Sequence, residues 1–404
     1  MRAGLVRAVQ NNPAYDEAPA GVHAGSLECM VAIPIALARR AAVDARADDA
    51  GAGSDETGVG GGPLVDAYGR VHRDLRISLT DRCSLRCTYC MPEQGNEWLA
   101  RTSILSTDEI VRIARVAADA GITTFRLTGG EPLLRADVVE VVRRLAGIAG
   151  ADGPVQLAMT TNGIRLAQLL PALVDAGLQR LNISLDTLDG ERFRALTRRD
   201  RLDDVLSGIR AAQASGLRPL KLNTVAMRGV NDDELVDLVD FALAHDAQLR
   251  FIEQMPLDAG HTWDRQQMVT REEILDRLSA RWTLTPLPGR GGAPAERFQL
   301  DGGPHTVGVI ASVTAPFCGN CDRLRLTADG QLRNCLFSTT EYDLLPVLRG
   351  AGSGADGGVD GGTDAGAAAI EAVLRACVRG KLPGHAINDP SFLQPVRGMN
   401  AIGG

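Results

Sequence analysis

Short runs of apolar and β-branched residues alternate with amphipathic stretches along the middle of the chain. Six such runs are each followed by polar or glycine residues and then by a segment with helical periodicity; they span residues 75–79, 124–127, 156–159, 180–185, 220–225 and 249–252. Repeated strand–helix alternation predicts parallel strands joined by crossover helices. Six units fall short of the eight that close a barrel, so we expect an α/β fold with an open, partial (β/α)6 TIM-like barrel.

Two of the intervening segments show the helical pattern clearly. In residues 107–120 the apolar positions recur at helical spacing, and Thr107 is expected to be the N-cap. Residues 232–245 begin with acidic side chains, which favour the amino end of a helix. Because functional side chains in parallel α/β folds gather at the carboxyl ends of the strands, we expect the site in the loops that follow the six runs.

Two glycine-rich segments divide the chain. Residues 49–62 contain six glycines in fourteen positions, and residues 350–367 contain eight in eighteen. Such segments bury too little apolar surface to offset their backbone entropy, so we expect both to be flexible. This predicts three parts, namely a low-complexity extension over 1–65, a barrel over 66–312, and a C-terminal lobe over 313–404 that carries the 350–367 insert and a tail of Gly403 and Gly404.

The composition excludes several classes of protein. With 43 Lys+Arg, 50 Asp+Glu and a net charge of −7, the chain lacks the basic character of a nucleic-acid binder. No run approaches the 18 uncharged apolar residues that a membrane span needs, so we expect no membrane partner. Six of the eight cysteines fall in two short clusters and no secretory signal is evident, which predicts metal ligands in a cytoplasmic protein.

The first cysteine cluster has the spacing C-x3-C-x2-C and directly follows the first predicted strand. It comprises Cys83, Cys87 and Cys90. Three thiolates can hold three irons of a [4Fe–4S] cluster and leave the fourth iron without a protein ligand. An open metal position suits a catalytic site. The alternative is a tetrahedral zinc site completed by a distant His or Asp.

The second cysteine cluster has the spacing C-x2-C-x13-C and comprises Cys318, Cys321 and Cys335. A zinc ribbon would need a second C-x2-C pair, so a second [4Fe–4S] cluster with an open iron is favoured over zinc. Arg323 and Arg325 lie two apart in a predicted hairpin strand and therefore point to the same face. Two guanidiniums there suit a polyanionic substrate, although charged residues also protect edge strands.

The cysteine loop RCSLRCTYC and the sequence TGGEP at residues 128–132 are similar to two motifs of the radical S-adenosylmethionine superfamily. The resemblance implies that S-adenosylmethionine binds the open iron of the first cluster and that one electron cleaves it to a 5′-deoxyadenosyl radical. It further implies that the cofactor is contacted by Tyr89, Gly130, Glu131, Ser184 and Met255.

The order of these motifs, together with the second cluster and the terminal Gly-Gly, resembles one family of that superfamily, the GTP 3′,8-cyclases of molybdenum cofactor biosynthesis. The resemblance implies conversion of GTP to (8S)-3′,8-cyclo-7,8-dihydroguanosine 5′-triphosphate, with the second cluster orienting the guanine. The implied GTP contacts are Arg76, Arg126, Thr160, Lys221, Arg323, Leu324 and Arg325, and the implied catalytic residues are Arg323, Arg325, Gly403 and Gly404.

Several alternatives stay open from the residues alone. Each strand cation could form an ion pair with a barrel carboxylate such as Glu253 or Asp186. The chain could also be a radical S-adenosylmethionine maturase with another substrate, or a non-catalytic protein stabilised by zinc. The resemblance implies an electron donor, either a reductase or a flavodoxin-type protein, and a downstream cyclic pyranopterin monophosphate synthase. The resemblance is also compatible with a homodimer.

Overall fold

The computed structural model describes residues 62–404 except 96, 259–261, 351–363, 391 and 404. Most of the predicted extension and most of the predicted insert lie outside the described residues. The flexible insert was predicted to end at residue 367, but residues from Asp364 onward belong to helix α9 (Asp364–Arg379). This stretch is rich in alanine, the residue with the highest helix propensity, which outweighs the glycine at position 366.

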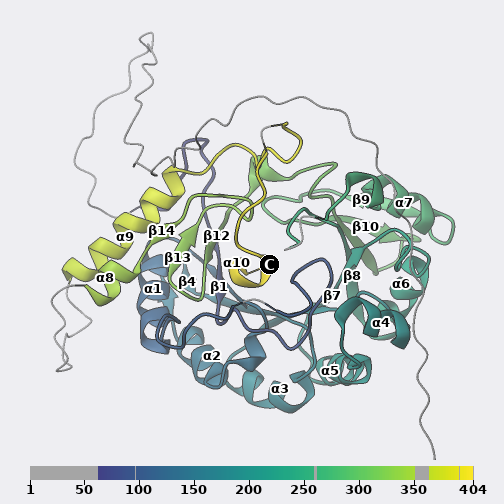
Figure 1. Ribbon diagram of the computed structural model, residues 1–404, viewed down its shortest axis with the longest axis horizontal. Coiled ribbons are helices and arrows are strands. Elements are labelled where there is room, and N and C mark those ends of the chain that lie inside the picture. The colour runs from purple at the N-terminus through teal and green to yellow at the C-terminus, as the bar shows by residue number, and fades with distance from the viewer. Residues whose placement is uncertain (1–61, 96, 259–261, 351–363, 391, 404) are drawn as a thin grey trace, which may run out of the picture. The chain divides into compact units, whose positions relative to one another are not determined.

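Twelve strands form one continuous, curved sheet (Figure 1). Their order is β14 (Tyr342–Asp343), β13 (Gln331–Arg333), β12 (Arg323–Leu326), β1 (Asp74–Ser78), β2 (Thr124–Thr128), β5 (Gln156–Thr161), β6 (Arg180–Ser184), β7 (Leu220–Ala226), β8 (Ala247–Glu253), β11 (Thr306–Ile310), β10 (Glu296–Leu300) and β9 (Leu284–Leu287). The strands from β12 to β11 in this order pair in parallel, and the outer pairs are antiparallel.

The six predicted strands are confirmed as β1, β2, β5, β6, β7 and β8. The later part of the chain extends this sheet at both ends. Strand β12 pairs in parallel with β1, whereas β11 pairs in parallel with β8. The expected partial barrel is therefore present, and strands that follow it in the sequence lie on either side of it.

Helices cover the outer face of the sheet, and one short helix lies inside its curve (Figure 1). They are α1 (Thr107–Asp119), α2 (Val138–Ala146), α3 (Leu166–Asp175), α4 (Gly190–Thr197), α5 (Leu202–Ala214), α6 (Leu235–Ala244), α7 (Arg271–Ser279), α8 (Leu345–Arg349), α9 and α10 (Met399–Ile402). Short 3₁₀ turns η1 (Pro132–Leu134), η2 (Arg265–Gln267) and η3 (Cys318–Asn320), and a small pair of strands, β3 (Ala149–Gly150) and β4 (Gly153–Pro154), complete the described elements. The inner helix is α10, at the end of the chain.

Helix α1 begins as expected, but its N-cap is Ser106 and not the predicted Thr107. The Ser106 hydroxyl accepts a hydrogen bond from the Glu109 N–H at 3.2 Å, and the Glu109 carboxylate accepts one from the Ser106 N–H at 2.7 Å. This reciprocal capping box satisfies two amino-terminal donors at once. Serine and threonine are both good N-cap residues, so where they are adjacent the sequence alone does not decide which of the two caps the helix.

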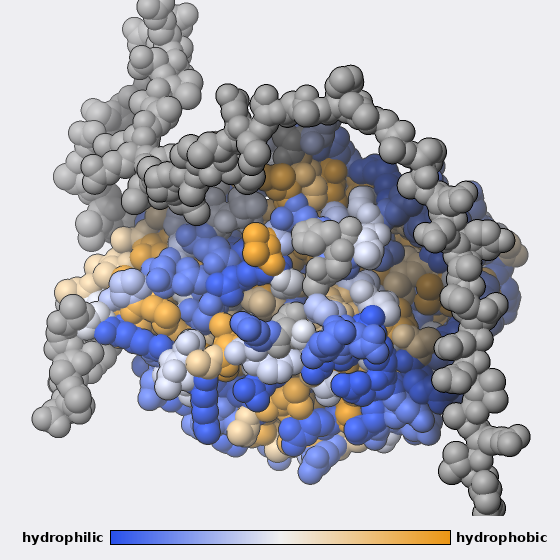
Figure 2. Space-filling model, in the orientation of Figure 1, coloured by the Kyte–Doolittle hydropathy of each residue, from blue (hydrophilic) through white to orange (hydrophobic). Residues whose placement is uncertain are grey.

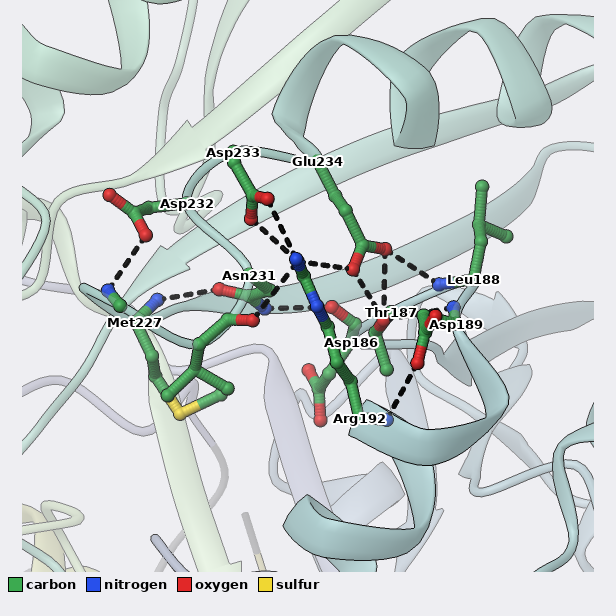
Figure 3. A network of polar contacts seen from close by, with 12 residues as sticks. Asp186, Thr187, Leu188, Asp189, Arg192, Met227, Asn231, Asp232, Asp233 and Glu234 are labelled. Carbon is green, nitrogen blue, oxygen red and sulfur yellow. Dashed lines mark hydrogen bonds and ion pairs between the residues drawn. The ribbon is translucent and has the colours of Figure 1, made fainter.

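Helix α6 begins at Leu235, three residues later than the predicted helix over 232–245. The acidic residues that suggested a first turn bind other elements instead. Asp233 and Glu234 pair with Arg192 of α4, at 2.6 and 2.8 Å (Figure 3). Because these carboxylates pair with α4 instead of capping α6, the segment before Leu235 forms turns.

Alternation along the strands separates the hydrophobic core from the polar interior. In β1, Leu75 and Ile77 are completely buried in the main core cluster, whereas Asp74 and Arg76 line a cavity. Successive strand residues point to opposite faces of a sheet. The apolar positions therefore pack toward the helices, and the polar positions are left for the inner face.

No helix in the part of the chain that the structure describes is long and apolar enough to cross a membrane. Figure 2 shows that the visible described surface is mostly hydrophilic, with hydrophobic patches separated from one another. Separate patches of this kind are usual on protein surfaces.

Candidate active site

A cavity of about 490 Å³ lies on the inner side of the curved sheet. Its centre is a row of three arginines that strand pairing brings to the same level, because Arg76 of β1 is in register with Arg126 of β2 and with Arg325 of β12. All three side chains line the cavity. Its volume is within the range of pockets that hold ligands the size of a nucleotide.

The cavity carries a strong excess of positive charge. Its lining includes two carboxylates, Asp74 and Asp322, against nine cations, which are Arg73, Arg76, Arg126, Arg180, Lys221, Arg250, Arg297, Arg323 and Arg325. Among the described residues, the Nε atoms of Arg76 and Arg180 are buried without a hydrogen-bond partner. Unpaired buried cations are costly, so this lining fits an anionic ligand with several charges.

Mutual repulsion and burial weaken the protonated state of these cations. Burial lowers the pKa of the Arg76 guanidinium well below its usual value, and the charges of Arg325 and Arg323 add to that effect. Burial and the neighbouring arginines likewise lower the pKa of Lys221 to about 8. A bound polyanion would reverse both effects.

The alternative that strand cations pair with Glu253 or Asp186 is wrong, because both carboxylates have other partners. Glu253 accepts hydrogen bonds from the N–H groups of Arg271 and Val313, each at 2.8 Å. Asp186 accepts one from the Val225 N–H at 2.9 Å. Neither acid therefore neutralises a strand cation of the cavity.

The first cysteine set lies in the loop after β1, and its three thiols are half-buried. The Arg86 guanidinium donates to the carbonyls of Cys83 and Leu85 at 2.7 and 2.8 Å and thereby holds the loop closed on itself. Burial raises the pKa of the Cys83 thiol to about 11 and that of the Cys90 thiol to about 12. These thiols are therefore neutral unless a cation compensates the charge of the thiolate, and a bound metal would do so.

The two glycines of TGGEP pack directly against the base of this cysteine loop. A Cβ on Gly129 would lie 2.4 Å from the Thr80 carbonyl oxygen, and one on Gly130 would lie 2.3 Å from that of Arg82. The Gly130 N–H donates to the Thr80 carbonyl at 2.7 Å. The motif therefore joins the ends of β1 and β2, and only glycine fits at these two positions.

Glu131, in the same motif, is buried and saturated with hydrogen bonds. Its carboxylate accepts from the Leu133 N–H at 3.0 Å, the Thr161 hydroxyl at 2.7 Å and the Asn162 N–H at 2.7 Å. Burial raises the pKa of the Glu131 carboxyl to about 7, against the effect of these donors. The side chain connects the loops after β2 and β5, and its predicted contact with the cofactor stays a prediction.

Tyr89 of the cysteine loop connects to a polar network at the carboxyl ends of β6 and β7. Its hydroxyl donates to Asp186 at 2.7 Å, and the Asp186 carbonyl accepts from the Asn231 side chain at 2.7 Å. The Thr187 hydroxyl donates to Glu234 (Figure 3). The network holds the loops after β6 and β7 together beside the cysteine loop.

The other residues predicted to contact cofactor or substrate are distributed around the same inner side. Met255, Thr160 and Lys221 line the cavity, and Ser184 ends the neighbouring strand β6. The Thr160 hydroxyl accepts a hydrogen bond from the Asn182 side chain at 3.3 Å. Their roles stay predictions, but their positions agree with one continuous site.

The second cysteine set borders the cavity from the C-terminal side. Cys318 begins η3, Cys321 directly follows it, and Cys335 comes two residues after β13. Arg323 donates to the Cys321 sulfur at 3.4 Å, and its guanidinium lies 4.5 Å from the centre of the Phe317 ring. Arg323 thus contacts both the cysteine set and the cavity.

Leu324 has a different environment from its two arginine neighbours. Its side chain is completely buried in the hydrophobic core, on the opposite face of β12. A substrate contact from Leu324 would therefore have to come from its main chain. That predicted contact stays a prediction.

The C-terminal tail enters the interior of the sheet (Figure 1). Asn400 of α10 donates to the Asp81 carbonyl at 3.0 Å, and its main chain hydrogen-bonds to Cys90. Gly403 is buried, and its carbonyl accepts a hydrogen bond from Arg325. The tail therefore extends from the first cysteine loop to the arginines of the cavity, whereas Gly404 lies outside the described residues.

Some lining cations, such as Arg180 and Arg297, were not among the predicted contacts, and the sequence left Arg250 open between a substrate contact and an ion pair. Arg180 and Arg250 lie in β6 and β8 and line the cavity, and the Arg250 Nε donates to the Asn223 side chain at 2.9 Å. In the sequence, Arg180 and Arg250 could have been recognised as cations within otherwise apolar strands, as Arg76 was. Arg297 comes from β10, and no sequence pattern indicated that this strand reaches the cavity.

The donor sets suit iron–sulfur clusters. Each set offers three soft thiolate ligands from a short segment or hairpin, which leaves one position of a [4Fe–4S] cluster open. Among the described residues, no group of three or more His, Cys, Asp or Glu side chains is arranged to hold a metal ion, so the choice between clusters and zinc rests on the number and spacing of the thiols.

Comparisons with known proteins agree with this geometry. The family model "Radical SAM superfamily" matches residues 77–242, and the model "Molybdenum Cofactor Synthesis C" matches residues 247–357. The chain is 53% identical to a GTP 3′,8-cyclase of Streptomyces coelicolor over 84% of its length and 96% of that protein. It is 49% identical to a GTP 3′,8-cyclase of Corynebacterium glutamicum, with 84% and 89% covered.

A solved structure, Streptococcus suis SuiB bound to S-adenosylmethionine, is similar over 68% of this chain and 64% of that chain, with 15% identity and a TM-score of 0.49. At that level the likeness adds nothing to the argument. The identity to the cyclases, together with the coverage of both sequences, decides the classification. The chain belongs to the GTP 3′,8-cyclase family of the radical S-adenosylmethionine superfamily.

Proposed function

We propose that this chain converts GTP to (8S)-3′,8-cyclo-7,8-dihydroguanosine 5′-triphosphate, an early step of molybdenum cofactor biosynthesis. The observation that carries the proposal is the cavity with nine cations, bordered by the second cysteine set and by a tail that contacts the first. A nucleoside triphosphate matches this excess of charge, because guanidinium groups bind phosphate oxygens in a planar fork.

The chain's own residues bind and orient the substrate in this proposal. Arg76, Arg126 and Arg325, at one level of three adjacent strands, hold the triphosphate. Arg323 extends this cationic row toward Cys321. Thr160 of β5 and Lys221 of β7, farther along the same sheet, contact the nucleotide.

Two [4Fe–4S] clusters and S-adenosylmethionine are the cofactors in this proposal. Cys83, Cys87 and Cys90 would hold the first cluster, and the residues 318, 321 and 335 would hold the second. When bound, these groups would supply the one-electron chemistry that removes the hydrogen at ribose C3′ of GTP and allows C3′ to bond to guanine C8, with one electron and one proton needed to complete the product. Tyr89, Gly130, Glu131, Ser184 and Met255 would surround the S-adenosylmethionine.

The tail excludes water and restricts the substrate in this proposal. Gly403 contacts Arg325, and α10 lies between the first cysteine loop and the cavity. A site that generates a radical benefits from exclusion of solvent, because side reactions are prevented. The electron would come from a reductase or a flavodoxin-type donor, and the product would pass to a cyclic pyranopterin monophosphate synthase.

The test uses GTP that carries deuterium at C3′. Because the product has the mass of GTP, unlabelled mass analysis alone does not reveal cyclisation. The reconstituted protein is incubated without oxygen with S-adenosylmethionine, a reductant and either labelled GTP or another nucleoside triphosphate that carries deuterium at the same position. We expect deuterium in the 5′-deoxyadenosine and a chromatographically distinct isomer of GTP, and neither with ATP, CTP or UTP.

Variants connect this reaction to the cavity. Arg323→Ala and Arg325→Ala are expected to weaken GTP binding at least tenfold and to leave cleavage of S-adenosylmethionine possible, because each removes a charged contact. Arg143→Ala, an exposed arginine of α2 paired with Glu140, is the matched control. Unchanged GTP affinity in both cavity variants, or zinc in place of iron in either cysteine set, would contradict the proposed function.

A further inference from the structure

Lys381 is a buried lysine beside the second cysteine set, and the proposed reaction assigns it no role. It is only 4% exposed and comes two residues after the end of α9. The turn that delivers it depends on Gly380, where a Cβ would lie 2.0 Å from the Tyr342 hydroxyl oxygen. A side chain at position 380 would displace Tyr342, so glycine suits the turn that leads to Lys381.

The three donors of the Lys381 ammonium all have partners in this second lobe. Nζ lies 2.7 Å from the carbonyl oxygen of Arg323, 2.7 Å from that of Asn334 and 3.6 Å from the Cys321 sulfur. Arg323 belongs to β12, and Asn334 directly follows β13. One side chain thus ties both strands of the hairpin to a cysteine of the second set.

The charge of Lys381 has no carboxylate partner in the described part of the chain, since none of the ion pairs there includes it. Burial lowers the pKa of the Lys381 ammonium, and the negative charges of Cys321, Cys335 and the neighbouring Asp322 oppose that effect. A buried ammonium without a counter-charge is strongly unfavourable. The Lys381 ammonium donates a hydrogen bond to the Cys321 sulfur, so a cluster held by this sulfur would bring negative charge into direct contact with the lysine.

A second cation holds the same loop from the other side. Arg70 donates to the Cys318 carbonyl at 2.7 Å and to the Leu382 carbonyl at 2.8 Å. Its Nε pairs with the buried Asp66 at 2.6 Å. The loop that carries Cys318 is thus joined to the residue that follows Lys381, which makes the lysine and the cysteines one rigid unit.

We propose that Lys381 is a positioning residue of the second iron–sulfur cluster, one that fixes the Cys321 sulfur by an N–H···S hydrogen bond and raises the reduction potential of the cluster. The inference rests on the proposed function, because it requires that this set binds a [4Fe–4S] cluster. Reduction adds one negative charge to such a cluster. A fixed cation at a ligand sulfur stabilises the reduced state more than the oxidised one.

The experiment measures the midpoint potential of the second cluster by reductive titration followed by electron paramagnetic resonance. The full-length chain carries Cys83→Ser, Cys87→Ser and Cys90→Ser, so that only the second set binds iron. In this background, Lys381→Gln removes the charge and keeps a hydrogen-bond donor, and Lys381→Arg keeps the charge. Arg379→Gln is the matched control, since it removes an exposed cation from the end of the same helix.

We expect Lys381→Gln to disfavour reduction roughly tenfold, which is 59 mV for a one-electron couple. Lys381→Arg should recover most of this shift, and Arg379→Gln should leave the potential unchanged. An unchanged potential in Lys381→Gln with full iron content overturns the inference. If Lys381→Gln does not bind iron, the Lys381→Arg variant becomes the test. Wild-type iron content and potential in Lys381→Arg support the role of the charge. Failure of Lys381→Arg to bind iron overturns it. Zinc in the parent protein would instead refute the proposed function.

Discussion

At the end of the chain, the requirement for glycine follows from geometry. Gly403 has φ +82°, a conformation that residues with a side chain rarely adopt, and a Cβ there would lie 2.3 Å from the Ser78 hydroxyl oxygen. Its carbonyl also accepts the hydrogen bond from Arg325. From the sequence alone, the terminal Gly-Gly could equally be a frayed end. In the structure, Gly403 is packed in the interior.

We predict that Gly403→Ala slows cyclisation of GTP at least tenfold while cleavage of S-adenosylmethionine continues. The strained backbone alone costs about 1–2 kcal/mol, and the clash with Ser78 adds to it. The ratio of cyclised product to 5′-deoxyadenosine is the measurement. Gly384→Ala, at a glycine with open space around its Cα, is the control. A ratio equal to that of the unmodified protein would refute this role of the tail.

Lys221 makes GTP binding depend on pH. Burial, together with Arg250, Arg126 and Arg180, lowers its pKa from 10.5 to about 8 in the ligand-free protein. A bound triphosphate stabilises the ammonium, so binding takes up a proton when the pH exceeds 8. The affinity contributed by Lys221 is therefore complete below pH 7 and decreases as the pH rises through 8.

We predict a decrease in GTP affinity of roughly tenfold between pH 7 and pH 9, from the uptake of one proton. Isothermal titration of the protein with GTP across this range is the measurement. Lys221→Met should bind more weakly at pH 7 and should have lost most of the pH dependence. If both proteins show the same slope, another group is responsible for it.

At the scale of elements, the strands were predictable and the exact helix starts were not. A buried parallel strand requires a run of apolar residues, and all six such runs became strands. Helix starts depend on which polar side chain finds a partner. Ser106 rather than Thr107 caps α1, and the acids before α6 bind Arg192 rather than the helix end. Local spacing does not contain that information.

The segment that precedes α10 is attached by Arg397 to the hairpin formed by β12 and β13. Arg397 donates to both oxygens of Asp329, at 3.2 and 2.9 Å, and to Glu341 at 3.1 Å. Asp329 is in the turn between β12 and β13, and Arg397 comes two residues before α10. The arginine therefore fixes the direction in which α10 enters the interior.

We predict that Arg397→Ala loosens α10 without unfolding the protein. Hydrogen exchange of the amides in residues 398–403 should accelerate, cyclisation should decrease several-fold, and the free energy of unfolding should change by only about 1 kcal/mol. Arg375→Ala removes a comparable pair, with Glu371 on α9, and is the control. Unchanged exchange in the tail would show that α10 does not depend on this contact.

At the scale of the whole molecule, the site is assembled from distant parts of the sequence. Strand β12 lies beside β1 although 249 positions separate Arg76 from Arg325, and the tail reaches the same arginines from the end of the chain. The sequence identified the cysteine sets and several of the cations. It did not indicate that Arg297 of β10 would line the cavity, because strand order beyond the repeated units is set by tertiary packing.

This assembly gives the cavity its charge independently of any cofactor, because all nine cations come from the strands or from residues next to them. We therefore predict that the apoprotein binds inorganic tripolyphosphate and that this ligand competes with GTP. The affinity should decrease with ionic strength, since several cations contribute to it. Titration calorimetry at low and high salt is the measurement, with neutral guanosine as the control ligand. A failure of the apoprotein to bind tripolyphosphate would mean that the clusters, and not the strands, organise the cavity.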